Sequence, residues 1–167
     1  GEHHRTQLRA AGHDHVSVIA DGVDRALIRP VDVSELRHQL GLADKVTVGI
    51  QGNFTWYDEL GGGMGWELVH AIARRPDLGL HAVLIGDGPG ITQLRSIADE
   101  LGVSDRIHVM GRVPYGELSR YLSLCDFTLL TQTDDPSSWA RTTGKLPTYL
   151  ASGRHSLASR VGTAADV

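Results

Sequence analysis

From Lys45 onward the chain repeats one unit: a short apolar run, a loop rich in glycine or polar residues, and an amphipathic stretch. The apolar runs are continuous rather than alternating, which is typical of strands buried on both faces. Strands that alternate with helices build βαβ units, whose right-handed crossovers give a parallel sheet. We therefore expect an α/β fold, a Rossmann-like open parallel sheet with helices on both faces. The expected strands are 45–50, 81–86, 106–111, 126–131 and 155–159.

The stretches between these strands have helical spacing. Apolar residues recur along 90–102 at the i, i+3, i+4 spacing of a buried stripe, and Gly102 stands where a helix would be capped. Helices are likewise expected in 65–75, 115–125 and 145–153.

The first 44 residues follow a different pattern. Val16–Ala20 predicts a short strand, and Ser34–Leu40 predicts a brief helix with Ser34 as its N-cap. Gly1–Gly12 looks like the tail of a helix, either a frayed terminus or the remnant of an earlier domain. The chain also stops soon after the fifth strand, where a further helix normally covers the sheet. We therefore expect a remnant and linker over 1–30 and a Rossmann-like domain, cut at its C-terminus, over 31–167.

Composition excludes several classes of protein. The 167 residues suffice for one domain with a real core, and the net charge of −4 offers no basic excess for nucleic acid. No apolar run approaches the ~20 residues of a membrane span, and Gly1–Ala10 is too polar for a signal peptide. Cys125 is the only cysteine, so we expect a core thiol, no internal disulfide and a cytoplasmic location.

The nine histidines do not form a recognisable metal motif. His13 and His15 are two positions apart, HExxH does not occur, and one cysteine cannot complete a zinc site. We expect no metal.

Ligands of open parallel sheets bind outside the carboxyl ends of the strands, and the loops there are rich in glycine and polar residues. Three familiar motifs fail in these loops. A dinucleotide fingerprint is excluded because Trp66 and Ile91 stand where the third glycine belongs. A P-loop is excluded because Leu146, not serine or threonine, follows Lys145, and no G-x-S-x-G elbow occurs.

The stretch "WARTTGKLPTYLASGR" remains a candidate anion site. Arg141, Thr142, Thr143, Gly144 and Lys145 stand where a helix is expected to begin, and free N–H groups at helix N-termini attract phosphate. The alternative is that both threonines only cap the helix and Arg141 is solvated.

Taken together, three segments resemble the C-terminal half of a GT-B glycosyltransferase, of the retaining family 4, "glycosyl transferases group 1". They are "VIADGVD…IRP", "VLIGDGPGITQLRSIADELGVSDRIHVMGRVPYGELSRYLSLCDFTLL" and "GKLPTYLASGRHSLASRVGTAADV". The resemblance runs from about Val16 to Val167. Its ordered series "GDGP…GRVP…GK-L-x-Y-L-A-x-G" is far more specific than "GDGP" alone.

The resemblance implies a domain that binds a nucleotide-diphospho-sugar, without a metal or other cofactor, for transfer of the sugar with retained configuration. It assigns the base to backbone groups of Arg112 and Val113. The diphosphate falls to Lys145 and the Arg141–Gly144 amides, bordered by Asn53 and Gly62 in the Gly61–Gly63 loop. The acceptor domain of the parent chain would be a partner, and only that parent would associate peripherally with a membrane.

Two departures from the family pattern are visible. Its two glutamates, eight positions apart, correspond here to Ala140 and Thr148, and Thr148 replaces the one that binds ribose. Loss of a charged hydrogen bond costs ~1–3 kcal/mol. The basic pair usual after the first strand is also missing, and Asp58 and Glu59 would oppose a diphosphate if they pointed inward.

Three hypotheses follow from the sequence. The chain is a fragment of a working glycosyltransferase that does not turn over alone, a degenerate domain that serves as a binding or scaffold module, or another α/β nucleotide-binding domain. Of the three tryptophans, Trp66 is expected in the core, while Trp56 and Trp139 stand in loops of the binding face.

Overall fold

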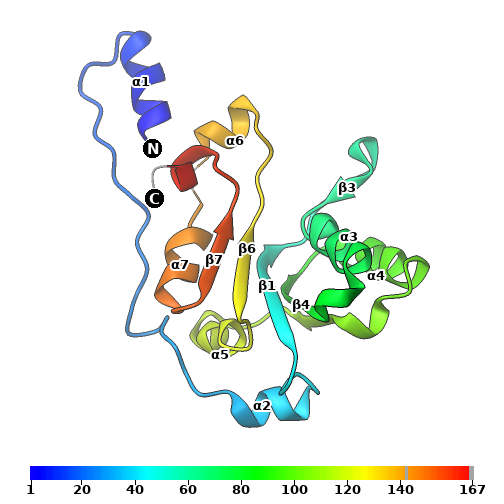
Figure 1. Cartoon of the computed structure of the whole chain (residues 1–167). Helices are drawn as coiled ribbons and strands as arrows, with labels where there is room; N and C mark the ends of the chain where they lie inside the picture. The colour runs from blue at the N-terminus through cyan, green and yellow to red at the C-terminus, as the bar shows by residue number, and fades with distance from the viewer. Residues whose placement is uncertain (142, 166–167) are drawn as a thin grey trace.

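The computed structural model describes residues 1–141 and 143–165. Its centre is a five-stranded parallel sheet in the order β5-β4-β1-β6-β7 (Figure 1). The strands are β1 Val46–Asn53, β4 Leu80–Asp87, β5 Ile107–Gly111, β6 Phe127–Leu130 and β7 His155–Ala158. All five expected strands are confirmed. β1 runs three residues further than predicted, and this extension brings Asn53 level with Asp87 of β4.

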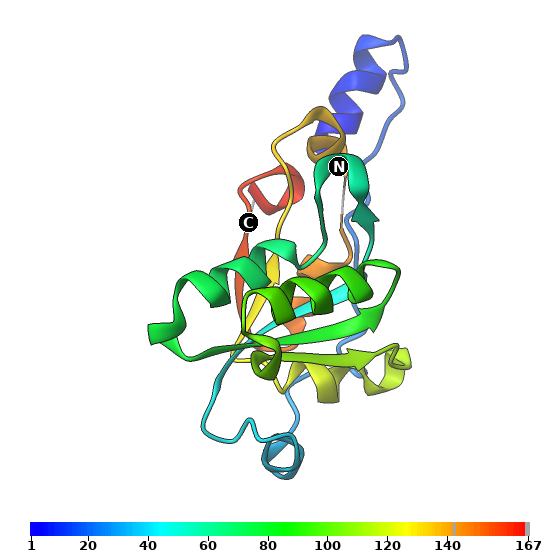
Figure 2. The same cartoon turned by 90° about the vertical axis from the view of Figure 1, so that its right-hand side faces the viewer.

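Helices cover both faces of the sheet, as expected. Along β4, Ala82 and Leu84 pack on one side of the sheet while Val83 and Ile85 pack on the other. The first side is covered by α3 (Trp66–Arg74) and α4 (Gly90–Glu100), and the second by α5 (Leu118–Leu122) and α7 (Lys145–Ala151), as Figures 1 and 2 show. Cys125 is fully buried in the second core, which confirms its packing role, and burial raises the pKa of its thiol to about 12.

The remaining elements are short. They are α1 Glu2–Ala10, α2 Ser34–Gln39, the hairpin β2 Trp56–Tyr57 and β3 Gly62–Gly63, and α6 Pro136–Ala140. Single 3-10 turns occupy Asp58–Leu60, Pro76–Leu78, Ser104–Arg106, Tyr115–Glu117 and Gly162–Ala165. Gly102 follows α4 with φ +69°, the left-handed cap that the sequence predicted.

Two predictions near the N-terminus are wrong. Val16–Ala20 is not a strand: the segment pairs with none of the strands in the described chain, and Ile19 is 90% exposed. Ser34 is not the N-cap of α2 but its first residue. The N-cap is Val33, which makes no side-chain cap hydrogen bond. The Ser34 amide and hydroxyl donate instead to Oδ1 of Asp32, at 3.0 and 2.7 Å.

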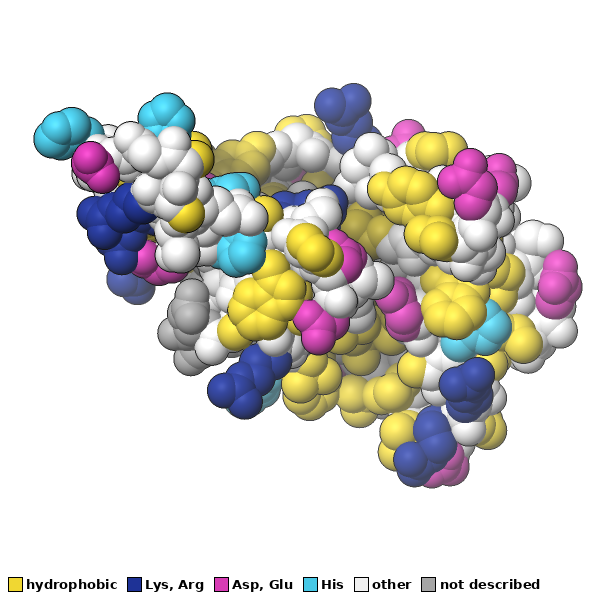
Figure 3. Space-filling model, turned by 90° about the horizontal axis from the view of Figure 1, so that it is seen from above, with side chains coloured by type: hydrophobic (Ala, Val, Ile, Leu, Met, Phe, Trp, Pro, Cys, Tyr) yellow, Lys and Arg dark blue, Asp and Glu magenta, His cyan; other side chains and the backbone are white. Residues whose placement is uncertain are grey.

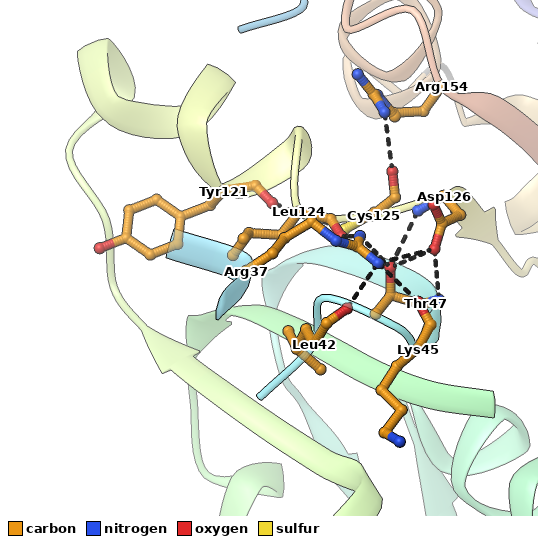
Figure 4. A network of polar contacts seen from close by, with 9 residues as sticks. All are labelled: Arg37, Leu42, Lys45, Thr47, Tyr121, Leu124, Cys125, Asp126 and Arg154. Atoms are coloured by element: carbon orange, nitrogen blue, oxygen red, sulfur yellow. Dashed lines mark hydrogen bonds and ion pairs between the residues drawn. The ribbon is translucent and has the colours of Figure 1, made fainter. Parts of the chain in front are cut away.

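Arg37 ties α2 to the amino end of the sheet (Figure 4). Its guanidinium donates to the carbonyls of Leu42 at 2.8 Å, Lys45 at 2.6 Å and Leu124 at 2.5 Å, and lies 3.5 Å from the Asp126 carboxylate. The chain already packs against the core of the domain upstream of α2. Ile28 is fully buried, although the sequence predicted a linker as far as residue 30.

Candidate functional site

The carboxyl ends of β1 and β4 form a rim built largely of backbone. Gly52 and Gly86 lie side by side in register, and a Cβ on Gly86 would overlap the carbonyl oxygen of Gly52. Gly86 also has φ +137°, which L-residues rarely adopt. Just beyond the rim the Phe54 amide donates to the carbonyl of Asp87 at 2.9 Å, and this hydrogen bond holds the segments that follow β1 and β4 together. The result is a rigid edge that a ligand can approach closely.

A cavity of about 630 Å³ opens beside this rim, over the ends of β1, β4 and β5, and we call it the β4–β5 cavity. Arg112 and Val113, the predicted base-binding residues, both line it. Among the described residues around it, Asp87 is the one carboxylate and Arg112 the one cation. Tyr115, half exposed, adds an aromatic ring at its wall.

A second cavity of about 700 Å³ lies on the other side of Asn53, and we call it the β1–α7 cavity. Its walls are the β2–β3 hairpin, the loop after β6 and the start of α7. Gly62, Arg141 and Lys145 line it, and Asn53 lines both cavities. Figure 3 looks down on this carboxyl edge, where the surface is hollowed between α6 and the hairpin.

Lys145 is the central cation of the β1–α7 cavity. It is the first residue of α7, and its Nζ reaches the end of β1, 3.1 Å from where a Cβ on Gly52 would stand. The nearest polar partner is the sulfur of Met64 at 3.2 Å, and within the described chain the ammonium forms no ion pair. Burial, and secondarily Arg141, lowers the pKa of Lys145. A half-buried charge without a counter-ion is costly, so an anion bound here would be favoured.

The other residues predicted around the diphosphate are placed less favourably. Arg141 is exposed just after α6, and its Nη2 is 3.5 Å from the Ser137 hydroxyl. The Thr143 hydroxyl accepts from the Lys145 amide at 3.3 Å, although the N-cap of α7 is Gly144 and no side chain caps the helix. Gly144 is exposed and lines neither cavity. Thr142 lies outside the described residues.

Thr148 does not face either cavity. It is 8% exposed, and its hydroxyl donates to the carbonyl of Gly144, one turn earlier, at 2.7 Å. The next residue, Tyr149, is fully buried, and its hydroxyl accepts from the Gln51 amide at 2.7 Å. This face of α7 therefore packs beneath the end of β1.

Several cavity residues were missed by the sequence. Gln51, Gly52 and Asp87 line the β4–β5 cavity because the strands extend beyond their apolar cores, which the hydrophobic pattern alone does not reveal. Trp66, expected in the core, is half-buried, packs against the core and also lines the β1–α7 cavity. The Trp139 indole donates to Asp134 at 2.6 Å.

The two carboxylates that the sequence analysis named as possible opponents of a diphosphate lie outside both cavities. Asp58 and Glu59 are exposed in the turn of the β2–β3 hairpin and line neither cavity. Elsewhere in the described residues, no three histidine, cysteine or acidic side chains gather closely enough to hold a metal ion. Nor does any helix of that part combine the length and apolarity needed to cross a membrane.

Comparison with known proteins identifies glycosyltransferases as relatives of this chain. Residues 45–167 match the family model of Glycosyl transferases group 1. The 2-deoxystreptamine glucosyltransferase of Streptomyces kanamyceticus is 27% identical over 122 residues, which are 69% of this chain and 30% of that protein. Anabaena HepE, crystallised with UDP and glucose, superimposes with a TM-score of 0.73 at 25% identity, over 97% of this chain and 43% of HepE.

Sucrose-phosphate synthase from Thermosynechococcus elongatus has the same fold, with a TM-score of 0.64 at 22% identity over 97% of this chain and 40% of that one. The chain spans less than half the length of these relatives. Its five-stranded α/β sheet is consistent with the C-terminal half of a GT-B glycosyltransferase. The chain belongs to the Glycosyl transferases group 1 family and is a glycosyltransferase domain. This decides against the third hypothesis, an unrelated nucleotide-binding domain.

Proposed function

We propose that this chain is the donor-binding half of a two-domain, retaining glycosyltransferase of family 4, which uses a nucleotide-diphospho-sugar without a metal or other cofactor. An acceptor domain in the parent protein completes the catalytic cleft, so the isolated chain does not turn over. The parent acts in the cytoplasm, with at most peripheral contact with a membrane. The segment before Ile28 connects the two halves, and the chain from Ile28 onward forms most of the donor domain.

The observation that carries this proposal is the position of Lys145. Its ammonium is half-buried without an ion pair in the described chain, and it lines the β1–α7 cavity close to Gly52, which lines the β4–β5 cavity. The two cavities share Asn53 and lie side by side along the carboxyl edge of the sheet. A nucleoside diphosphate is elongated and carries its charge at one end, which suits this arrangement. Support also comes from HepE, whose crystal structure contains UDP and glucose.

In this proposal the base lies in the β4–β5 cavity against Arg112 and Val113. The diphosphate lies in the β1–α7 cavity against Lys145, with Arg141 at the rim. Asn53 and Gly62 border it from the other side. As the bond to the sugar breaks, negative charge grows on the leaving diphosphate, and a fixed ammonium in a partly desolvated site stabilises that charge.

Calorimetric titration with UDP, GDP, ADP and their sugar conjugates tests the proposal. We expect binding of at least one nucleoside diphosphate, weakened about tenfold or more in Lys145→Met, since hydrogen bonds to charged groups contribute ~1.5–3 kcal/mol. Lys45, half-buried just before the opposite end of β1 and paired with Asp44 at 3.1 Å, is the other lysine of the chain, and Lys45→Met is the matched control, with unchanged affinity expected.

The second candidate is a degenerate domain that serves as a scaffold. The observation that favours it is that the Thr148 hydroxyl already donates to the Gly144 carbonyl within α7 and is not available to a ligand. The same titration separates the two. Absence of binding at millimolar nucleotide in the wild-type chain would favour the scaffold and overturn a donor-binding role.

A further inference from the structure

Strand order dictates which part of a nucleotide would lie over which strand. The sheet runs β5-β4-β1-β6, so β4 lies between the strand that leads to Arg112 and the strand that ends at Asn53. Neighbouring strands are about 4.8 Å apart, which is roughly the step from base to ribose and from ribose to phosphate. This inference rests on the proposed function. If the base lies beyond β5 and the diphosphate beyond β1, the ribose lies beyond β4.

The residue at the end of β4 is Asp87. It lies opposite Asn53 in register, and it is the one carboxylate among the described residues of the β4–β5 cavity. Its Oδ1 accepts a hydrogen bond from the Gly88 amide at 2.8 Å, which fixes the orientation of the side chain. Its Oδ2 accepts no hydrogen bond from the described residues, and the side chain is exposed at the cavity.

The backbone around Asp87 is rigid. Its carbonyl accepts from the Phe54 amide at 2.9 Å, and the Phe54 carbonyl accepts from the Gly90 amide at 2.8 Å. A Cβ on Gly88 would stand 2.7 Å from the Asn53 amide oxygen, so the loop lies tightly against β1. A carboxylate held in this way is pre-organised, and little side-chain entropy is lost when it binds a ligand.

The position on α7 offers no comparable group. Thr148 is buried, donates its hydroxyl proton within its own helix and lines neither cavity. A ribose exposes two vicinal hydroxyls, both donors, and a carboxylate is the side chain that can accept from both. We propose that Asp87 binds the 2′- and 3′-hydroxyls of the donor's ribose, so that this domain holds the ribose from the end of β4 rather than from α7.

Paired ligands test this assignment. The affinity of the nucleoside diphosphate that the wild-type chain binds is compared with that of its 2′,3′-dideoxy analogue, in wild type and in Asp87→Asn. Asparagine keeps the oxygen that accepts from the Gly88 amide, so the loop is retained, and unchanged thermal unfolding checks this. Asp58→Asn, an equal charge change on the exposed hairpin turn, is the matched control.

We expect Asp87→Asn to weaken binding of the ribonucleotide about tenfold or more and to leave the dideoxy analogue unchanged. Asp58→Asn should leave both unchanged. Equal effects on the two ligands would overturn the proposal, and so would tighter binding, which is the sign expected of a carboxylate that merely repels the diphosphate. In those cases nucleotide binding by the wild type still supports the proposed function. If the wild type binds no nucleoside diphosphate, both proposals fall.

Discussion

Thr148 shows how one side chain can occupy a family's ligand position without serving as a ligand. A threonine in a helix readily bonds to the carbonyl one turn back, and this one does so at 2.7 Å. The hydroxyl that sequence reasoning assigned weakly to ribose is therefore already used. Lys145, three residues earlier on the same helix, makes no such local bond within the described residues and extends to the end of β1. Such orientations depend on tertiary packing and cannot be read from spacing alone.

Thr148→Glu should not tighten binding of the nucleoside diphosphate, because position 148 faces neither cavity and, in our proposal, the ribose is held from the end of β4. The same change buries a carboxylate at a site that is 8% exposed in the wild type, so the free domain should be less stable. Calorimetry and thermal unfolding measure the two effects separately. Thr148→Val, which removes only the hydroxyl, should leave affinity unchanged. Tighter binding in Thr148→Glu would instead mean that the ribose is held from α7, as the family pattern implies, and would contradict its assignment to β4.

At the level of the element, the amino ends of β4 and β5 hold a pair of histidines. Nδ1 of His81 lies 3.0 Å from Nε2 of His108, so one ring donates to the other only while the pair keeps an unprotonated acceptor. Burial lowers the pKa of both rings, and His108 lowers that of His81 further. The neighbouring charges are mixed, with Lys45 and Arg106 opposing protonation and Asp105 favouring it.

This pair should make the sheet sensitive to acid. Because both pKa values are lowered on folding, the unfolded chain binds more protons. The stability that the pair contributes is therefore present above the ordinary histidine pKa of about 6.5 and is lost as pH falls toward the lower folded-state values. Urea unfolding at pH 7.5 and pH 5.5 measures the loss. In His108→Asn the loss should be smaller, whereas an identical pH dependence would show that other groups cause it.

At the level of the whole molecule, the order of strands and helices was predictable because a two-faced sheet imposes a strong hydrophobic pattern. The ends of the elements were not. The last residues of β1 are polar or glycine, and their pairing with β4 is set by the neighbouring strand rather than by their own composition. Both cavities lie at these strand ends, which lack the hydrophobic pattern of the strand interiors. Sequence reasoning therefore located the edge where both cavities lie and named three of their lining residues, Asn53, Arg112 and Lys145, but did not name Asp87.

The packed unit begins earlier than the sequence indicated. Ile28 is fully buried, and the amides of Arg29 and Val31 donate to hydroxyls of α5 and the residue after it, Ser119 and Ser123, at 3.0 and 3.1 Å. By contrast, α1 contains no buried residue.

Removal of residues 1–12 should leave the unfolding temperature nearly unchanged, since little buried surface is lost. Removal of residues 1–31 should lower it by several degrees, because a core isoleucine costs ~2–5 kcal/mol. Differential scanning calorimetry of the two truncated chains checks both expectations. Equal melting of the two would mean that the segment around Ile28 does not contribute to the core.

The glycine rim described above also bears on how this domain can evolve. Gly52, Gly86 and Gly88 all have positive φ, and a Cβ on Gly86 or Gly88 would overlap a backbone carbonyl oxygen, so substitution at these positions is unfavourable. Substitutions along this edge are therefore tolerated mainly at the rim positions that carry side chains, which include Asn53, Asp87 and Arg112. A lineage of such domains would change its choice of donor mainly by exchanging those residues, while the scaffold that presents them stays the same.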